Sequence, residues 1–215
     1  MNTITVWTHV PYRDKDYHPD WKQWVSDHLI GIRSKIVVPD YITSEEKTYI
    51  ATHSELQFSI RKMCLSVSAT GRDRCRCVRF KRIDYGRRPA RWFPVYLYVT
   101  DEQEDQMFAQ ACIDADTPYL EDIVSGVLDS VPPRGAIFYG NNALPYDYRR
   151  VVTANLFETR IIPGMEDAVW CSEEVILLLK IGWFPISEPA DTFRPDMACR
   201  IAEKLEFIPL EERNL

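Results

Sequence analysis

Hydrophobic residues recur along the chain with two different periods, and each period predicts one type of element. Alternation with period two, which is typical of strands, first appears at Thr3–Thr8. Four more predicted strands follow in the middle of the chain, separated by polar turns: Tyr49–Phe58, Met63–Ala69, Cys77–Ile83 and Trp92–Val99. Their close succession predicts an antiparallel meander.

Helical spacing appears in four other segments. The predicted helices are Trp21–Ile36 with Asp20 as N-cap, a helix opened by Thr100 that ends before Pro118, one with the apolar run Val175–Ile181, and one within residues 191–207 with Asp196 in its first turn. The stretch Leu120–Arg160 predicts a long surface connection around one or two short helices. Helices flanking a mostly antiparallel sheet make the fold class α+β.

Length and composition predict a single domain over residues 1–215. The chain is 46% hydrophobic and contains no internal repeat or low-complexity tract. A formal net charge of -6 gives no overall attraction to phosphate backbones, so no nucleic acid partner is expected. The N-terminus lacks a signal-peptide pattern and no apolar stretch reaches the roughly 20 residues of a membrane span, which predicts a cytoplasmic protein with free thiols.

Cys171 stands apart from the other cysteines because of its position. It lies where a loop containing Pro163 and Gly164 meets an apolar helix. A thiol at a helix N-terminus meets unpaired N–H groups and the positive end of the helix dipole, which favour the nucleophilic thiolate. Glu173 and Glu174 complement the dipole, but their negative charge would oppose the thiolate.

The remaining cysteines are interpreted as structural residues. Cys64 and Cys77 fall in predicted strands, Cys112 and Cys199 on helical faces, and the Cys75–Cys77 pair lacks the spacing and histidine partners of a zinc site. No metal and no cofactor are expected. A metal module formed by Cys64, Cys75, Cys77 and a histidine remains the third-ranked alternative.

Among the four histidines, His53 is the best placed to serve as a base for Cys171. Strand alternation puts His53, Glu55 and Gln57 on one face. If Phe58 faces residue 63 across a turn at 59–62, Ser68 lies opposite His53 and Ser66 opposite Glu55. The alternative is a solvated sheet face. His9, His18 and His28 are interpreted as surface histidines.

Two short motifs now carry a family resemblance. The tripeptide CSE at 171–173 resembles the cysteine motif of the circularly permuted NlpC-type peptidases, papain-like proteins similar to the YiiX group and to relatives of lecithin retinol acyltransferase. The segment THSEL at 52–56 resembles the histidine strand of that family, which precedes the cysteine helix. Similarity extends to the RCVRFKRI segment, to Arg91–Phe93 and to the acidic helix start after Thr100. The size and lack of accessory domains resemble viral and phage members.

The resemblance implies a circularly permuted papain-like fold and a cysteine hydrolase of the amidase or peptidase class. Cys171 would be the nucleophile and His53 the base, forming an acyl-enzyme from a peptide, isopeptide or acylated substrate. The family places a third polar group near Ser66, and because serine orients an imidazole poorly, we name Glu55 as the third member with Ser66 or Ser68 as alternatives. An acyltransferase with the same dyad, and a non-catalytic binding or structural protein that keeps the fold, are the competing hypotheses.

Overall fold

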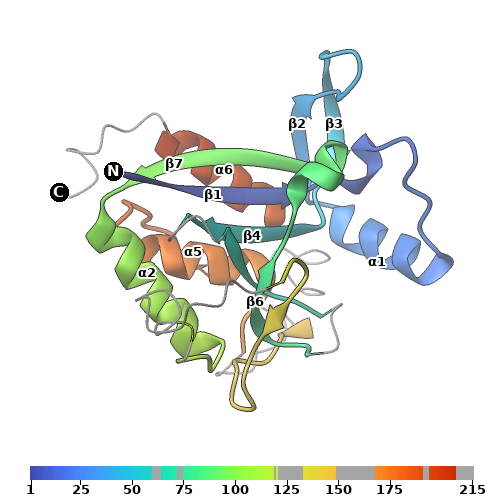
Figure 1. The fold of residues 1–215 in the computed structure, drawn as a ribbon. Coiled ribbons are helices and arrows are strands. Elements are labelled where there is room, and N and C mark those ends of the chain that lie inside the picture. Colours follow the sequence, from blue (N-terminus) through green and yellow to red (C-terminus); the bar gives the residue numbers. More distant parts are fainter. Residues whose placement is uncertain are drawn as a thin grey trace.

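A six-stranded sheet with antiparallel neighbours forms the centre of the fold (Figure 1). The computed structural model describes residues 1–59, 64–71, 75–118, 120, 133–148, 168–190 and 194–206. The sheet contains β1 (Asn2–His9), β4 (His53–Phe58), β5 (Leu65–Ala69), β6 (Val78–Arg82), β7 (Trp92–Val99) and β8 (Ile137–Phe138), in the order β7-β1-β4-β5-β6-β8. The predicted α+β class with a mostly antiparallel sheet is therefore confirmed.

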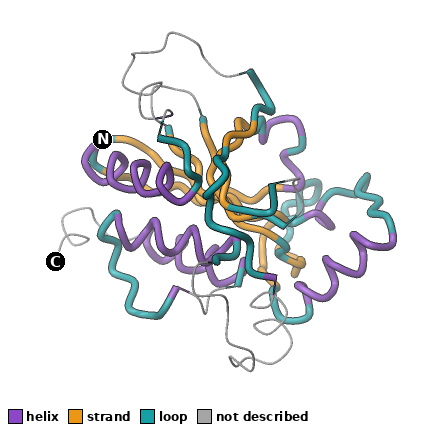
Figure 2. The backbone as a smooth tube through the Cα atoms, turned by 90° about the horizontal axis from the view of Figure 1, so that it is seen from below, coloured by secondary structure: helices purple, strands orange, loops and turns teal. Residues whose placement is uncertain are grey.

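Helices cover the apolar face of this sheet. They are α2 (Asp101–Asp114), α5 (Cys171–Ile181) and α6 (Pro195–Glu206). Helix α5 packs on β4 and β5, α6 packs on β1 and β7, and α2 packs on α5. Rings of Phe58, Phe80 and Phe108 contact one another inside this core. Figure 2 shows the strands gathered at the centre with helical segments around them. Within the described ranges, no helix is long and apolar enough to cross a membrane.

The last strand of the predicted meander lies elsewhere in the sheet. Strands β4, β5 and β6 are consecutive neighbours, but β7 pairs with β1 along its whole length, from Asn2 opposite Val99 to His9 opposite Trp92. Sequence proximity favoured a place beside β6. The short 3-10 turns at Tyr85–Arg87 and Pro89–Arg91 instead lead the chain to the other edge, where β7 buries Leu97 and Val99 in the common core.

The predicted helix Trp21–Ile36 is too long, and the predicted strand Tyr49–Phe58 is two strands. Helix α1 spans Trp21–Gly31, with Asp20 as its N-cap as predicted, and Ile36 belongs to β2 (Lys35–Pro39). At Gly31 the chain passes Ile50 so closely that a Cβ would lie 2.4 Å from Ile50 Cγ2. Strand β3 (Glu46–Ile50) pairs with β2 in a separate two-stranded sheet.

The β4–β5 hairpin differs from the predicted register by two residues. Phe58 pairs with Leu65 rather than with residue 63. Cys64, predicted in the strand, is exposed with a φ of 49°, so the turn is longer than expected. An even shift preserves which side chains share a face, so the polar face of the hairpin is retained. Residues 60–63 of the turn, and 121–132 and 149–160 of the predicted connection, lie outside the described residues.

Candidate active site

Helix α5 begins at Cys171. Trp170, the N-cap residue, has extended backbone angles, and its N–H donates to Glu173 Oε2 at 3.3 Å. This carboxylate satisfies a backbone group at the start of the helix, as in a capping box. The first α-helical bond runs from Glu174 N–H to the carbonyl of Trp170 at 3.0 Å. Glu173 therefore fixes the point at which the helix starts, and with it the position of the thiol.

The thiol of Cys171 and the imidazole of His53 are hydrogen-bonded to each other. Burial alone would raise the pKa of Cys171, but His53 and backbone hydrogen bonds from Ser54 and Ser172 lower it. Burial would likewise lower the pKa of His53, whereas Cys171 and Glu55 raise it to about 9. Both directions favour a thiolate beside an imidazolium.

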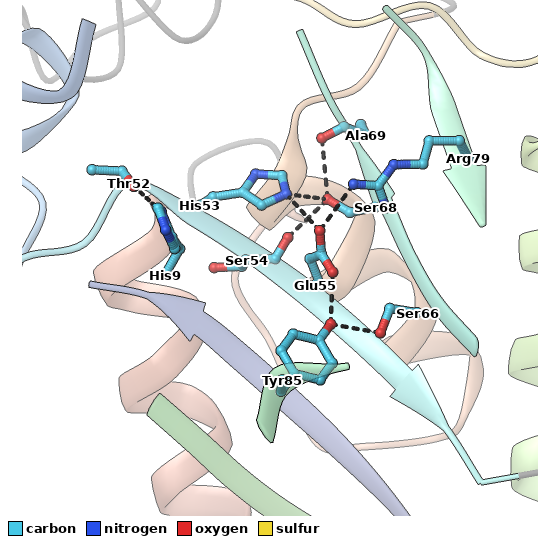
Figure 3. Close-up of polar contacts among 10 residues, drawn as sticks. All are labelled: His9, Thr52, His53, Ser54, Glu55, Ser66, Ser68, Ala69, Arg79 and Tyr85. Carbon is cyan, nitrogen blue, oxygen red and sulfur yellow. Dashed lines mark hydrogen bonds and ion pairs between the residues drawn. The ribbon is translucent and has the colours of Figure 1, made fainter. Parts of the chain in front are cut away.

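The other ring nitrogen of His53 faces the polar side of the sheet (Figure 3). Nε2 lies 3.1 Å from Glu55 Oε1 and 3.3 Å from Ser68 Oγ. The Ser68 hydroxyl donates to the carbonyl of Ser54 at 2.8 Å, so its oxygen is left to accept. Because both groups that face Nε2 are acceptors, Nε2 carries a proton. The remaining ring nitrogen, Nδ1, is therefore the one assigned to the contact with Cys171.

Glu55 is a buried carboxylate held by three donors. Besides His53, Arg79 Nη2 donates to Oε1 at 3.0 Å and Tyr85 Oη donates to Oε2 at 2.6 Å. Burial would raise the Glu55 pKa, but the Arg79 charge and these hydrogen bonds outweigh it and hold the pKa well below its usual range. Ser66 Oγ lies 2.6 Å from Tyr85 Oη and donates to it, because the Tyr85 proton is directed at Glu55. The carboxylate is therefore ionised and fixed.

Aromatic rings border His53 on the β1 and β7 side. The centroid of Trp92 lies 6.4 Å from that of His53 and 4.7 Å from that of His9. His9 Nδ1 lies 2.8 Å from Thr52 Oγ1, just before β4. The interpretation of His9 as a surface histidine is therefore wrong: it is a partly buried member of β1 that pairs with His53 across the strands.

The structure brings together Cys171, His53 and Glu55, with Ser68 at the edge of the group. Ser66, which was expected opposite Glu55, lies opposite Gln57 and contacts Tyr85, because the register of the hairpin differs from the predicted one. Sequence reasoning missed Arg79 and Tyr85. A signal for Arg79 was available, since alternation in β6 puts it on the face opposite Val78 and Phe80, and a buried carboxylate needs a cation.

Two other buried thiols, Cys77 and Cys199, differ from Cys171. Burial raises the pKa of Cys77 and of Cys199 to about 12 each, and neighbouring Cys75 and Glu203 add to the respective shifts. In the part of the chain that the structure describes, no group of three or more His, Cys, Asp or Glu side chains is arranged to hold a metal ion. In contrast to Cys77 and Cys199, Cys171 is a buried thiol whose surroundings favour its ionised form.

Comparisons with protein-family models, with curated proteins and with solved structures found no match for this chain.

Proposed function

We propose that the chain is a thiol hydrolase that acts on an amide, ester or thioester carbonyl through an acyl-enzyme. The observation that carries this proposal is the hydrogen bond between Cys171, at the first residue of α5, and His53, which lowers the pKa of the thiol and raises that of the imidazole. The order of a histidine strand before a cysteine helix supports a circularly permuted papain-like arrangement.

The proposed reaction has two halves. The Cys171 thiolate attacks the carbonyl carbon and forms a C–S bond, while the carbonyl oxygen takes the negative charge near the first N–H groups of α5. His53 gives its Nδ1 proton to the leaving amine, alcohol or thiol as the bond to it breaks. Water then attacks the thioester, His53 takes its proton, and the acid is released with the thiolate restored.

Glu55 acts in this scheme by holding the imidazole. Its carboxylate accepts from Nε2, which sets the ring orientation and stabilises the imidazolium. Peptides, isopeptides and acylated compounds all present a carbonyl that this arrangement can attack.

Thiol labelling tests the proposal directly. With iodoacetamide near neutral pH, we expect Cys171 to react fastest of the six cysteines, and His53→Ala to slow that reaction by about tenfold for each unit by which the thiol pKa rises. His18→Ala, on an exposed residue, is the matched control and should leave the rate unchanged. Mass spectrometry of the peptides gives each rate. Equal labelling of Cys171 and buried Cys199 would contradict the proposal.

Trapping of the acyl-enzyme completes the test. Incubation with an activated ester such as p-nitrophenyl acetate should add an acetyl group to Cys171, visible in the intact mass and absent from Cys171→Ala. Stable protein that labels at Cys171 but never acylates would favour a non-catalytic role.

A further inference from the structure

Helix α1 is turned so that its polar side meets the body of the protein. Asp27 is fully buried and accepts from Tyr17 Oη at 2.7 Å and from Gln23 Nε2 at 2.6 Å. Gly31 is also buried, against Ile50 of β3. An amphipathic helix on a globular protein usually buries its apolar stripe and exposes its polar side. Helix α1 does the reverse.

The outward side carries five large apolar residues, which we call the α1 apolar face. Its members, with exposed fractions, are Trp21 (73%), Trp24 (50%), Val25 (40%), Leu29 (45%) and Ile32 (52%). Steps of three, four, eight and eleven residues from Trp21 put them on one side of a helix. Single exposed apolar residues are normal on proteins, but a continuous row indicates a binding surface.

Charges near the α1 apolar face are mostly positive. From the N-cap of α1 to Pro39, the exposed charged residues are Lys22 and Lys35 against Asp20, while Arg33 is only partly exposed and Asp27 is buried. Lys22 Nζ lies 5.7 Å from the centre of the Trp21 ring. The whole chain has a net charge of -6, but salt screens charges beyond about 10 Å, so the local residues dominate at short range.

We propose that α1 docks the protein on an anionic phospholipid surface, lying flat at the interface. Tryptophan rings favour the boundary between headgroups and acyl chains, and basic residues beside them attract anionic headgroups. A second copy of the chain fits less well. An 11-residue helix is about 16 Å long and about 10 Å wide, far less area than the roughly 800 Å² per partner of a stable interface.

The position of α1 places this surface at one side of the molecule. In both Figure 1 and Figure 2 it lies at the opposite side from α2. Its contact with Ile50 connects it to the segment that leads directly into His53. Docking through α1 would therefore hold the His53 end of β4 near the lipid. This proposal is independent of the proposed hydrolase activity.

Vesicle binding of the full chain tests the proposal. We expect the protein to sediment with phosphatidylcholine–phosphatidylserine vesicles, and Trp21→Ala with Trp24→Ala to weaken that binding at least tenfold. Trp183→Ala is the matched control, because Trp183 is 52% exposed but follows the far end of α5 beside α2. Lys22→Glu should weaken binding by about fivefold or more, as expected for loss of one basic charge near the surface.

Three results would overturn the proposal. These are absence of vesicle binding by the wild type, equal binding by the double tryptophan variant, and equal loss on Trp183→Ala. Sedimentation equilibrium of the same variants adds an independent check. If the wild type forms a dimer that the tryptophan changes abolish, and vesicles do not compete with it, the α1 apolar face is an interface between copies instead. Circular dichroism verifies that each variant is folded, and Leu29→Ser serves as a second variant of the face.

Discussion

Two glutamates are buried to the same depth on either side of the candidate site, and their pKa values move in opposite directions. Glu55 lies on the polar face of β4, and Glu174 lies in the first turn of α5, three residues after Cys171. Both side chains are almost completely inaccessible to solvent. The pKa of Glu55 is lowered, whereas that of Glu174 is raised well above its ordinary value.

Their partners explain the difference. Glu55 receives donors from His53, Arg79 and Tyr85, which compensate for the loss of water. For Glu174, burial raises the pKa, and the negative charges of Asp114 and Glu173 raise it further. Within the described residues neither carboxylate oxygen of Glu174 has a hydrogen-bond partner. Burial alone favours the neutral form of a carboxyl group, and a buried carboxylate stays ionised only where specific donors bind it.

The comparison bears on the thiolate. An ionised carboxylate within one turn of Cys171 would oppose the negative sulfur, which was the difficulty that the sequence raised for Glu173 and Glu174. Because burial raises the pKa of Glu174 well above its ordinary value, its neutral form is favoured, so Glu174 places less negative charge near the sulfur than an ordinary carboxylate would. The carboxylate at the start of α5 is that of Glu173, which accepts from the Trp170 N–H. The ionised carboxylate of Glu55 lies instead beyond His53, where it stabilises the imidazolium.

The largest expected effect comes from removing the cation that compensates Glu55. Arg79→Met leaves a buried carboxylate without its ion-pair partner, and we expect the free energy of unfolding in urea to fall by about 3–5 kcal/mol near neutral pH. The deficit should shrink in acid. Glu55 has a lowered pKa, so the native pair contributes stability above the ordinary carboxyl pKa of 4.5, and that contribution is lost as pH falls through the folded pKa.

Arg87→Met provides the control for this experiment. Arg87 is mostly exposed and its guanidinium lies 3.6 Å from Asp84, so its removal should cost less than about 1 kcal/mol. If both substitutions cost the same small amount, the Arg79–Glu55 pair does not hold the carboxylate as argued above.

The next effect in size concerns Glu174 and has the opposite pH dependence. Its folded pKa is raised, so its contribution to stability is complete below the ordinary value of 4.5 and is lost as pH rises toward the folded pKa. Glu174→Gln removes this titration without changing the shape of the side chain. Relative to the variant, the wild type should lose about 1.4 kcal/mol per pH unit across that window.

Urea unfolding at several pH values above 4.5 measures the difference between the two proteins. The exposed Glu102→Gln is the matched control and should run parallel to the wild type. Parallel curves for Glu174→Gln and the wild type would mean that Glu174 is ionised in the folded protein, and the contrast with Glu55 would disappear.

Sequence patterns predicted the residues around the thiol better than they predicted the hydrogen-bond partners of Glu55. Alternation along β4 puts His53 and Glu55 on one face whatever the register, and an apolar run after a loop marks the start of α5 at Cys171. Arg79 and Tyr85 could not be assigned in the same way. Their contact with Glu55 depends on the hairpin register and on the path of residues 83–91, which places β7 beside β1.

Local periodicity also leaves the orientation of a helix undetermined. The spacing from Trp21 to Ile32 indicates an apolar stripe, and the ordinary expectation is that such a stripe faces the core. The structure buries Asp27 instead, because Tyr17 and Gln23 supply its hydrogen bonds. Which side of a helix meets the body depends on partners distant from it, such as Ile50 of β3.

The smallest expected effect separates the two acceptors at His53 Nε2. Ser68 Oγ is the more distant, at 3.3 Å, and its proton is directed at the carbonyl of Ser54. We expect Ser68→Ala to change the rate of Cys171 alkylation by no more than about threefold, in line with a weak neutral hydrogen bond.

Glu55→Gln removes the negative charge beside the imidazolium, so the His53 pKa should fall from about 9 and the Cys171 pKa should rise. The pH profile of Cys171 alkylation in this variant should therefore move to higher pH. Near neutral pH the rate should be about tenfold lower for each unit by which the Cys171 pKa rises.

Ser66→Ala completes the set, because Ser66 contacts Tyr85 rather than His53 and should leave the alkylation profile where it is. Circular dichroism and urea midpoints must show that each variant is folded, since Glu55→Gln also removes the anion beside Arg79. Our assignment requires the Glu55 substitution to move the profile most. A larger shift for Ser68→Ala would make the hydroxyl the orienting group, because only the acceptor that controls the Nε2 proton can change the basicity of Nδ1 toward the thiol. Glu55 would then remain ionised and fixed by Arg79 and Tyr85, with a structural role in the sheet.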